Sequence, residues 1–488
     1  MQTYTWPSAP SFIGRTDELA SMERWWASAS REPLNLYGRR RVGKSWLFRM
    51  FAHHKPALVL VAERTTPGRQ MEKFSQQLAE QLGVTPRIED LGDLFDAIFA
   101  VSNSKCLVVI DEFPYLLGST QREIDASLSK VQASMERHRD SSPVKIVLCG
   151  SAVAQMEDLQ TVQNPLHGRL QPLALQPLPF SGARLFMPAL TVDEQLVRYS
   201  ISGGMPRYLE MLSGKSLVEA LTNHVVDRNS PLFSEPPNVL QSELREVPTY
   251  FAILSALSSK PAGTPLIAEK TSVDVKRLGP YLRRLQELKI IRERGPAGAK
   301  PNARDRQWVC EDDFFRFWFR FVAPYKDHLE SGASAHEYVV QHVLPGLPDH
   351  TAQTFERVFR RYVRQQFTGP SQVDSWWGHA LNEQRKTKQR FTEEIDVVGL
   401  SGRKVHVAGE AKWTTKSMPV SVLRDLQEFK LPAMAQAGFV TNEAQIVMCS
   451  RKGFAKALLD EPVPGVELVD AQTMLTAVTL LGWWLVRA

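Results

Sequence analysis

Short apolar runs alternate with longer helical stretches between residues 34 and 178 of this 488-residue chain. The runs have the length and composition of buried strands, and the stretches between them have helical spacing. This alternation predicts an α/β domain in which helices wrap a parallel sheet. The expected strands are residues 34–37, 57–62, 106–110, 145–149 and 173–175.

The strand pattern stops at about residue 182, and helical spacing continues to about residue 242. A Ser-Gly-Gly-Met-Pro break at residues 202–206 interrupts this stretch, which we interpret as a small helical lid. Residues 250–294 then show three short helices followed by a strand, the order of a winged helix. Gly279 and Pro280 are the predicted start of its third helix, because proline at the first helical position loses no intrahelical hydrogen bond.

A second α/β domain is expected toward the C-terminus. A polar connector follows residue 325, and from about residue 351 the pattern predicts helix, hairpin, helix, strand, helix, strand and helix. The last apolar run, residues 474–486, is shorter than the roughly 20 residues needed to cross a bilayer. We therefore expect it to form a buried C-terminal helix.

Composition indicates the number of domains and the cellular compartment, and it says little about function. The length suggests about three domains of roughly 150 residues, and the net charge of +6 suits a polyanionic partner or an ordinary soluble protein. The four cysteines are spaced for neither a disulfide framework nor a zinc site, and the N-terminus lacks the regions of a signal peptide. We therefore expect a soluble, cytoplasmic protein with no membrane contact.

An octapeptide after the first expected strand has the pattern G-x-x-x-x-G-K-[ST]. It follows a strand and leads into a helix, the context in which this pattern forms a phosphate-binding loop. Gly38 and Gly43 let backbone amides turn toward phosphate, Lys44 would reach the β- and γ-phosphates, and Ser45 would bind Mg²⁺. The sequence therefore predicts ATP and Mg²⁺ as ligands, and a chance match in a basic loop is the alternative.

Four further residues are candidates for the same site. Asp111, after the apolar run 106–110, is placed to hold Mg²⁺ and Glu112 to polarise the attacking water, although an exposed strand end has the same composition. Ser151 would contact the γ-phosphate or water, or would cap the helix that follows it. Arg169 would stabilise charge during phosphoryl transfer, or is an ordinary solvated arginine.

The winged-helix region carries most of the excess positive charge. Between residues 260 and 294, nine basic side chains face four acidic ones, a net charge of +5. Arg283 and Arg284 on the third expected helix would contact DNA phosphates or bases in the manner of a recognition helix. Winged helices also serve as lids or protein-docking modules, and a basic helix face is often only solvated.

A second set of charged residues ends a predicted hairpin near the C-terminus. Of three E-x-K tripeptides, only Glu410 to Lys412 ends an alternating strand, whose two-residue period places both side chains on one face. Residues 394–400 form the partner strand, so Asp396 is expected beside Glu410. Asp396, Glu410 and the Ala411 carbonyl would hold Mg²⁺ near a scissile phosphate, and Lys412 would orient the attacking water. Glu356, at the edge of an apolar helical stripe, is a candidate further ligand.

These motifs together resemble two known families. Residues 12–19, 38–45, 109–112, 165–169 and 203–209 are similar to the archaeal-type ATPases of the AAA+/STAND group, a resemblance that covers about residues 8–325. Asp396, Glu410 and Lys412 match the motif of the PD-(D/E)xK nuclease superfamily, and Glu356 matches its common helix acid. Asp396 follows isoleucine where the motif's name has proline.

The resemblance implies an α/β architecture of several parts. We expect a P-loop NTPase sheet at residues 8–180, a helical lid at 181–242, a winged helix with connector at 243–325, and a restriction-endonuclease-like domain at 350–488. It also implies ATP hydrolysis coupled to conformational change.

Three functions fit these expectations. In the first, the nucleotide cycle controls a Mg²⁺-dependent nuclease acting on DNA or RNA. In the second, the protein is a nucleotide-controlled switch that binds nucleic acid or a protein partner through a non-cleaving docking domain. In the third, it is a DNA-binding regulator acting through Arg283 and Arg284. A homo-oligomer is compatible with each.

Overall fold

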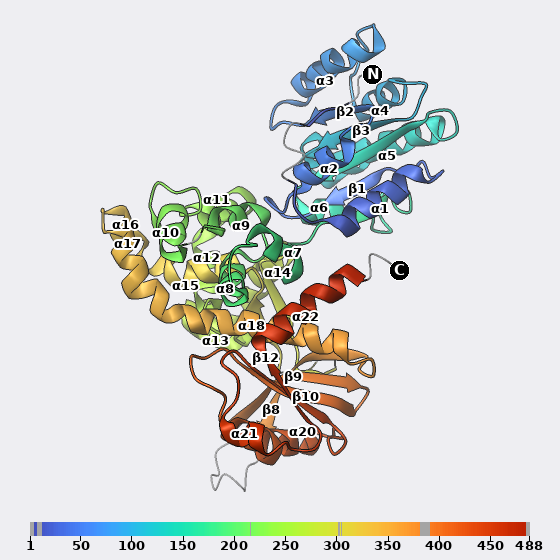
Figure 1. Cartoon of the computed structure of the whole chain (residues 1–488). Coiled ribbons are helices and arrows are strands. Elements are labelled where there is room, and N and C mark those ends of the chain that lie inside the picture. The colour runs from blue at the N-terminus through green and yellow to red at the C-terminus, as the bar shows by residue number, and fades with distance from the viewer. Residues whose placement is uncertain are drawn as a thin grey trace. The chain divides into compact units, whose positions relative to one another are not determined.

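The computed structural model describes residues 4–6, 12–214, 216–300, 303, 305–380 and 391–484 (Figure 1). The chain forms two compact units: Met1–Leu178 with Met205–Arg207, and Pro179–Gly204 with Tyr208–Ala488. The main division falls between Leu178 and Pro179. The segment expected to form a lid, residues 181–242, groups almost entirely with the C-terminal unit.

The first unit is built on a five-stranded parallel sheet, coloured blue to teal in Figure 1. All five predicted strands are present, within two residues of their expected ends. In spatial order they are β2 (Ala57–Val61), β3 (Cys106–Asp111), β4 (Val144–Gly150), β1 (Leu34–Tyr37) and β5 (Gln171–Ala174). Leu34 at the start of β1 pairs with Gln171 at the start of β5. Because all strands run the same way, their carboxyl ends share one edge.

Helices cover both faces of this sheet, as expected for a parallel sheet buried on two sides. Val108 and Ile110 of β3 and Leu148 of β4 share a core with Phe74 of α3 and Phe95 of α4. The helices of the unit are α1 (Thr16–Ala27), α2 (Lys44–Ala52), α3 (Pro67–Leu82), α4 (Leu91–Phe99), α5 (Gln121–His138) and α6 (Val153–Asp158).

The second unit begins with a helical region. Its helices before the winged-helix segment are α7 (Phe180–Ala183), α8 (Val192–Ser202), most of α9 (Pro206–Leu212), α10 (Leu217–Leu221) and α11 (Glu235–Glu243). The helices after that segment are α15 (Asp313–Phe321), α16 (Lys326–Glu330), α17 (Ala335–Tyr338) and α18 (Leu347–Gln366).

Three helices and a two-stranded sheet follow the order of a winged helix: α12 (Val247–Leu257), α13 (Thr264–Thr271), α14 (Val275–Glu287), then β6 (Ile291–Arg294) paired with β7 (Gln307–Cys310). The predicted start of the third helix at Gly279 is wrong. Helix α14 begins at Val275, where the Asp274 side chain accepts a hydrogen bond from the Lys276 amide at 2.7 Å, and Pro280 lies inside the helix. A side-chain cap defined this helix start better than proline did.

A mixed five-stranded sheet forms the C-terminal part, in the order β12 (Val466–Asp470), β11 (Gln445–Ser450), β10 (Lys404–Lys412), β9 (Phe391–Ser401) and β8 (Gln372–Ala380). The predicted hairpin is β9 and β10. The sequence did not predict β8. This strand pairs antiparallel with β9, so β8, β9 and β10 form a three-stranded antiparallel meander. The remaining helices are α19 (Val420–Asp425), α20 (Leu431–Gln436), α21 (Lys456–Asp460) and α22 (Ala471–Trp484).

Helix α18 packs its apolar stripe against this sheet and α22. Phe355, Phe359 and Val363 share a core with Val397 of β9 and Met474 of α22. The described part of the expected C-terminal helix is thus present, and its end at residues 485 and 486 lies outside the described residues. No helix in the described ranges is long and apolar enough to cross a membrane.

Candidate functional site

The phosphate-binding loop connects β1 to α2 at the carboxyl edge of the first sheet. Gly43 has φ +99°, a left-handed conformation that favours glycine, and a Cβ on Gly38 would lie 2.4 Å from the Leu175 carbonyl oxygen. The Lys44 ammonium is buried, and it donates hydrogen bonds to the carbonyls of Gly38 at 2.7 Å and Arg39 at 3.1 Å. Burial lowers the pKa of Lys44. The lysine therefore lies within its own loop, where a phosphate would compete with carbonyl oxygens for it.

Arg15 anchors this loop from outside the motif. Its guanidinium is almost fully buried, donates to the Val42 carbonyl at 2.9 Å and pairs with Glu18 at 2.8 Å. Residues 12–19 entered the sequence argument only through family resemblance, so this positioning role was missed. The signal available was an arginine beside a glycine just before an amphipathic helix.

Both acidic residues come from the end of β3, which is separated from β1 by β4. Ser45 Oγ donates to Asp111 Oδ2 at 3.3 Å, which joins the loop to the end of β3. The Glu112 carboxylate accepts hydrogen bonds from the backbone amide and hydroxyl of Ser151, at 3.1 Å and 2.8 Å. Ser151 therefore holds Glu112 and makes no side-chain cap on α6. Sequence reasoning placed all four residues at one edge, and the structure brings them together there.

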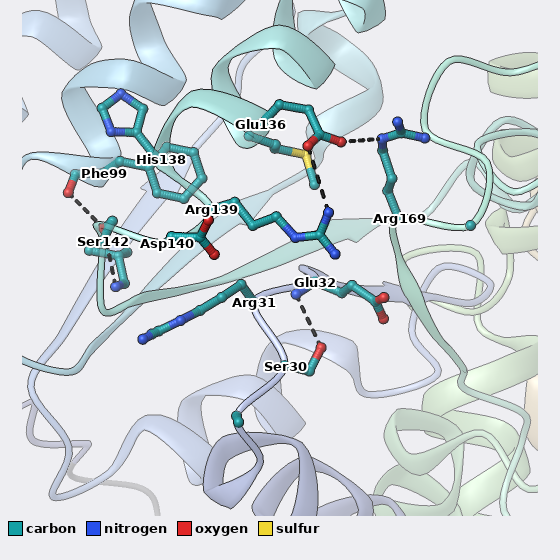
Figure 2. A pocket seen from close by; sticks show the side chains of 14 residues that line it. Ser30, Arg31, Glu32, Phe99, Glu136, His138, Arg139, Asp140, Ser142 and Arg169 are labelled. Carbon is teal, nitrogen blue, oxygen red and sulfur yellow. Dashed lines mark hydrogen bonds and ion pairs between the residues drawn. The ribbon is translucent and has the colours of Figure 1, made fainter.

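Arg169 does not join this group, which corrects the expectation that it stabilises charge at this loop. It lies just before β5, at the amino-terminal edge of the sheet, whereas the loop follows the carboxyl end of β1. There it lines a pocket of about 590 Å³ and pairs with Glu136 at 3.1 Å (Figure 2). Glu136 also pairs with Arg139 at 3.7 Å. In a parallel sheet the two edges are separated by the length of the strands, so Arg169 cannot reach the loop of its own chain.

The C-terminal charged residues converge as the strand period predicted. Asp396 Oδ2 of β9 accepts from the Ala411 amide at 2.9 Å and from the Lys412 ammonium at 3.3 Å. Lys412 also donates to Glu410 Oε2 at 2.8 Å. Glu410 is fully buried and Asp396 nearly so. We call Asp396, Glu410 and Lys412 the acidic cluster.

Lys430 is a member of this site that sequence reasoning missed. Its ammonium donates to Glu410 Oε1 at 2.7 Å. It ends a π-helical turn, Leu426–Lys430, between α19 and α20, and such turns often occur at functional sites. Glu428–Lys430 is another of the three E-x-K tripeptides, and it lies on a helical turn and not at the end of a strand. Its lysine reaches the cluster through packing over the sheet, which no local pattern predicts.

Glu356 lies on α18 near the cluster without completing it. Burial and the nearby Asp396 carboxylate raise the pKa of Glu356 to about 8. The same two causes raise the pKa of Glu410 to about 7, against the lowering effect of its two lysines. Within the described ranges, no three His, Cys, Asp or Glu side chains come close enough together to hold a metal. The described side chains therefore do not bring Glu356 into a three-residue metal site with Asp396 and Glu410, and its role as a third ligand stays a prediction.

The basic residues of the winged-helix region divide into two sets. Arg283 of α14 is exposed, and Arg284 pairs with Glu287 at 2.9 Å. Arg292 and Arg294 on β6 instead contact other groups, Glu311 at 3.4 Å and the ring of Trp377 at 4.7 Å. Only part of the charge counted in the sequence thus lies on the helix expected to contact DNA.

Comparison with known proteins separates the two ends of the chain. Residues 12–212 match the family of ATPase domains found predominantly in Archaea. These residues form an archaeal-type ATPase domain. Residues 318–422 match a family described as archaea bacterial proteins of unknown function. The ATPase domain is thus shown, and no activity is attached to the C-terminal part, where a nuclease stays a prediction.

Individual relatives cover very different shares of the chain. An uncharacterized protein of Methanocaldococcus jannaschii is 25% identical over 417 residues, covering 82% of this chain and 87% of that protein. An uncharacterized ATP-binding protein of the same organism is 43% identical over 44 residues, 9% of this chain and 75% of its own length. Among solved structures, a Walker-type ATPase of Pyrococcus abyssi has a TM-score of 0.47 and 18% identity, covering 66% of this chain and 99% of that one.

Proposed function

We propose that the ATPase domain binds and hydrolyses ATP with Mg²⁺. The observation that carries this proposal is the hydrogen bond from Ser45 to Asp111, because these are the loop hydroxyl and strand-end carboxylate that hold the metal in P-loop ATPases. Ser45 and Asp111 supply hard oxygen donors, which fit Mg²⁺. The metal ion, when bound, would neutralise charge on the phosphates.

The residues of the chain would then have separate tasks. Lys44 would exchange its loop carbonyls for phosphate oxygens, and Arg15 would hold the loop in place through Val42. Glu112 would orient water for attack and accept its proton. In the present arrangement Ser151 holds the Glu112 carboxylate, so Glu112 has to leave this serine to act.

Two variants test the ATPase proposal separately. Lys44→Ala should lose both nucleotide binding and hydrolysis, measured by titration calorimetry and phosphate release. Glu112→Gln should keep ATP affinity within about twofold and lose about 100-fold or more in turnover, the range for a general base. Turnover of Glu112→Gln at the parent rate would refute the assigned role.

We further propose that the C-terminal domain is a Mg²⁺-dependent nuclease under control of the nucleotide cycle. What supports it is the acidic cluster: two carboxylates and a lysine from adjacent strands, with the Lys412 ammonium between both acids. Magnesium is commonly bound by one or two carboxylates with substrate and water oxygens, so Asp396 and Glu410 fit as its ligands with the Ala411 carbonyl. The metal ion, when bound, would acidify water beside a phosphodiester.

In this proposal Lys412 holds the attacking water and offsets charge on the phosphate. The two carboxylates lie on a hairpin buried between helices, so their positions are fixed before substrate binds. End-labelled DNA and RNA incubated with the protein, Mg²⁺ and ATP should be cut. Cleavage should disappear with EDTA, with Lys412→Met and with Asp396→Asn. Lys44→Ala should change the rate of cleavage, because it removes the nucleotide cycle that controls the nuclease. Cutting by Lys412→Met at the parent rate would contradict the proposal.

One observation favours a second candidate, a nucleotide-controlled switch with a non-cleaving docking domain. Lys412 and Lys430 both contact Glu410, so the carboxylate already has two cationic partners without a metal. A structural role for this cluster would need no metal ion. Titration with Mg²⁺ discriminates the two candidates: a rise in melting temperature that Asp396→Asn abolishes supports the nuclease, and no rise supports the switch.

A further inference from the structure

A cavity lined by arginines opens beside α18 in the second unit. Its volume is about 670 Å³, and its lining includes five arginines but two acids, a net charge of +3. Four of the arginines belong to α18 and one to β6. We call this the arginine cavity: Arg292, Arg357, Arg360, Arg361 and Arg364, with Glu311 and Asp374.

The positive charge of the arginine cavity is only partly neutralised. Arg357 and Arg292 form ion pairs, with Asp313 and with Glu311. Arg360 and Arg364 instead donate to backbone carbonyls, of Asp396 and of Val373, both at 2.8 Å. A carbonyl accepts a hydrogen bond without cancelling a charge, so both guanidiniums keep their attraction for anions.

Arg361 is exposed, and within the described ranges it makes no hydrogen bond or ion pair. Residues 357, 360, 361 and 364 recur at the spacing that places side chains on one helix face. At about 1.5 Å rise per residue, the stripe from 357 to 364 is about 10 Å long.

The arginine cavity also adjoins the acidic cluster. Arg360 donates to the backbone oxygen of Asp396, whose carboxylate accepts from Lys412. The half-buried ring of Tyr199 lines the same cavity, and it packs edge-on against the buried ring of Phe180, 5.4 Å away between centroids. Aromatic side chains beside a positive groove are the features that hold single-stranded nucleic acid.

We infer that the arginine cavity binds the phosphates of a single nucleic-acid strand and leads it to Asp396 and Glu410. Guanidinium forks recognise phosphate oxygens in pairs, and α18 presents four of them along one face. The inference rests on the proposed nuclease function for its substrate class. It assigns a binding role to α18, which the sequence argument used only as a source of Glu356.

Binding without cleavage tests the inference apart from the nuclease proposal. The full-length protein is titrated in EDTA with fluorescein-labelled 20-nucleotide single-stranded DNA, the same RNA, a DNA duplex and polyglutamate, and anisotropy is read at several salt concentrations. The variants are Arg361→Ala, Arg361→Ala with Arg364→Ala, and Arg424→Ala. Arg424 is an equally cationic control on α19, 65% exposed and 3.9 Å from Glu428.

We expect the double variant to bind single strands about tenfold more weakly, and its salt slope to fall by about 1.4, or 0.7 for each lost phosphate contact. Arg361→Ala should show about half of this change in slope with unchanged folding, and Arg424→Ala should match the parent. Equal affinity of the double variant and Arg424→Ala would overturn the inference. So would polyglutamate binding as tightly as the oligonucleotides, which would indicate an acidic protein partner, or a clear preference for the duplex.

The cleavage assay separates the two failures. Strands that bind through Arg361 and Arg364 but are never cut would leave this inference standing and refute the nuclease. Cleavage that is unaffected when both arginines are replaced would support the nuclease and refute the role of the cavity.

Discussion

Replacing Lys430 with methionine (Lys430→Met) removes one of the two ammonium groups that contact Glu410. Lys430 Nζ lies 2.7 Å from Glu410 Oε1, and the Glu410 side chain is 1% exposed. Removing a sole partner from a buried charge costs about 3–5 kcal/mol. Lys412 remains at 2.8 Å, so we expect a smaller loss of about 1.5–3 kcal/mol, the range for a hydrogen bond to a charged group.

The size of this loss should depend on pH. The pKa of Glu410 is already raised to about 7, and removing a cation raises it further. A carboxyl with a raised pKa keeps its stability at low pH and loses it as pH rises through that pKa. At pH 6 the protonated carboxyl has little need of Lys430, so the variant and the parent should differ less there than at pH 8.

Hydrogen exchange of full-length protein measures this locally. Peptides covering β9 and β10 report the free energy of opening at pH 6 and pH 8. Lys404→Met is the matched control, because Lys404 also lies 2.7 Å from a carboxylate, that of Glu443, but both side chains are at least half exposed. Such surface pairs contribute about 0–1 kcal/mol. If Lys430→Met costs no more than Lys404→Met at pH 8, the buried ion pair does not stabilise the sheet as argued.

Two further predictions concern other parts of the second unit. A Cβ on Gly409 would lie 2.0 Å from the Val447 carbonyl oxygen, so Gly409→Ala should lower stability by about 3 kcal/mol or more. A Cβ on Gly279, which lies on a helix, would meet nothing within 4 Å, so Gly279→Ala should raise stability by about 0.5–1 kcal/mol. Melting temperatures of both variants equal to that of the parent would contradict both predictions. His350 is fully buried with Nε2 at 2.8 Å from the Ser200 carbonyl, and burial holds its pKa well below the ordinary 6.5. The contribution of His350 to stability should therefore fall as pH drops below 6.5, by at most about 1.4 kcal/mol per unit, opposite in sign to the contribution of Glu410. His350→Gln should remove this contribution, so the difference between variant and parent in denaturant titrations should change with pH below 6.5; a difference that is constant with pH would refute it.

Local sequence patterns predicted the elements that bury one face or both. The strands of the first sheet and the hairpin of Asp396 and Glu410 follow from apolar runs and a two-residue period, and each is present. Strand β8 was missed, because Ser375, Trp376 and Trp377 are buried in succession and show no two-residue period. The predicted start of helix α14 lies four residues too late, because the prediction relied on Pro280 and the cap at Asp274 marks the true start.

Residues that act across the fold were harder to predict. Lys430 reaches Glu410 from a helix packed over the sheet, and helix packing depends on side-chain volumes that no short motif contains. Arg169 could have been placed from the sequence, since residues before a parallel strand lie at the edge opposite to the residues after it. The arginine stripe of α18 was visible as a period, but its cavity also needs β6 and α8.

The position of β10 in the middle of its sheet has a consequence for how the C-terminal domain tolerates change. Its backbone is paired with β9 on one side and β11 on the other, so fraying at β8 or β12 leaves its neighbours in register. Glu410 also forms an ion pair with Lys430, which lies outside the sheet. Insertions or tags should therefore be tolerated best at the outer strands. A change in the 426–430 turn would directly alter the contact between Lys430 and Glu410.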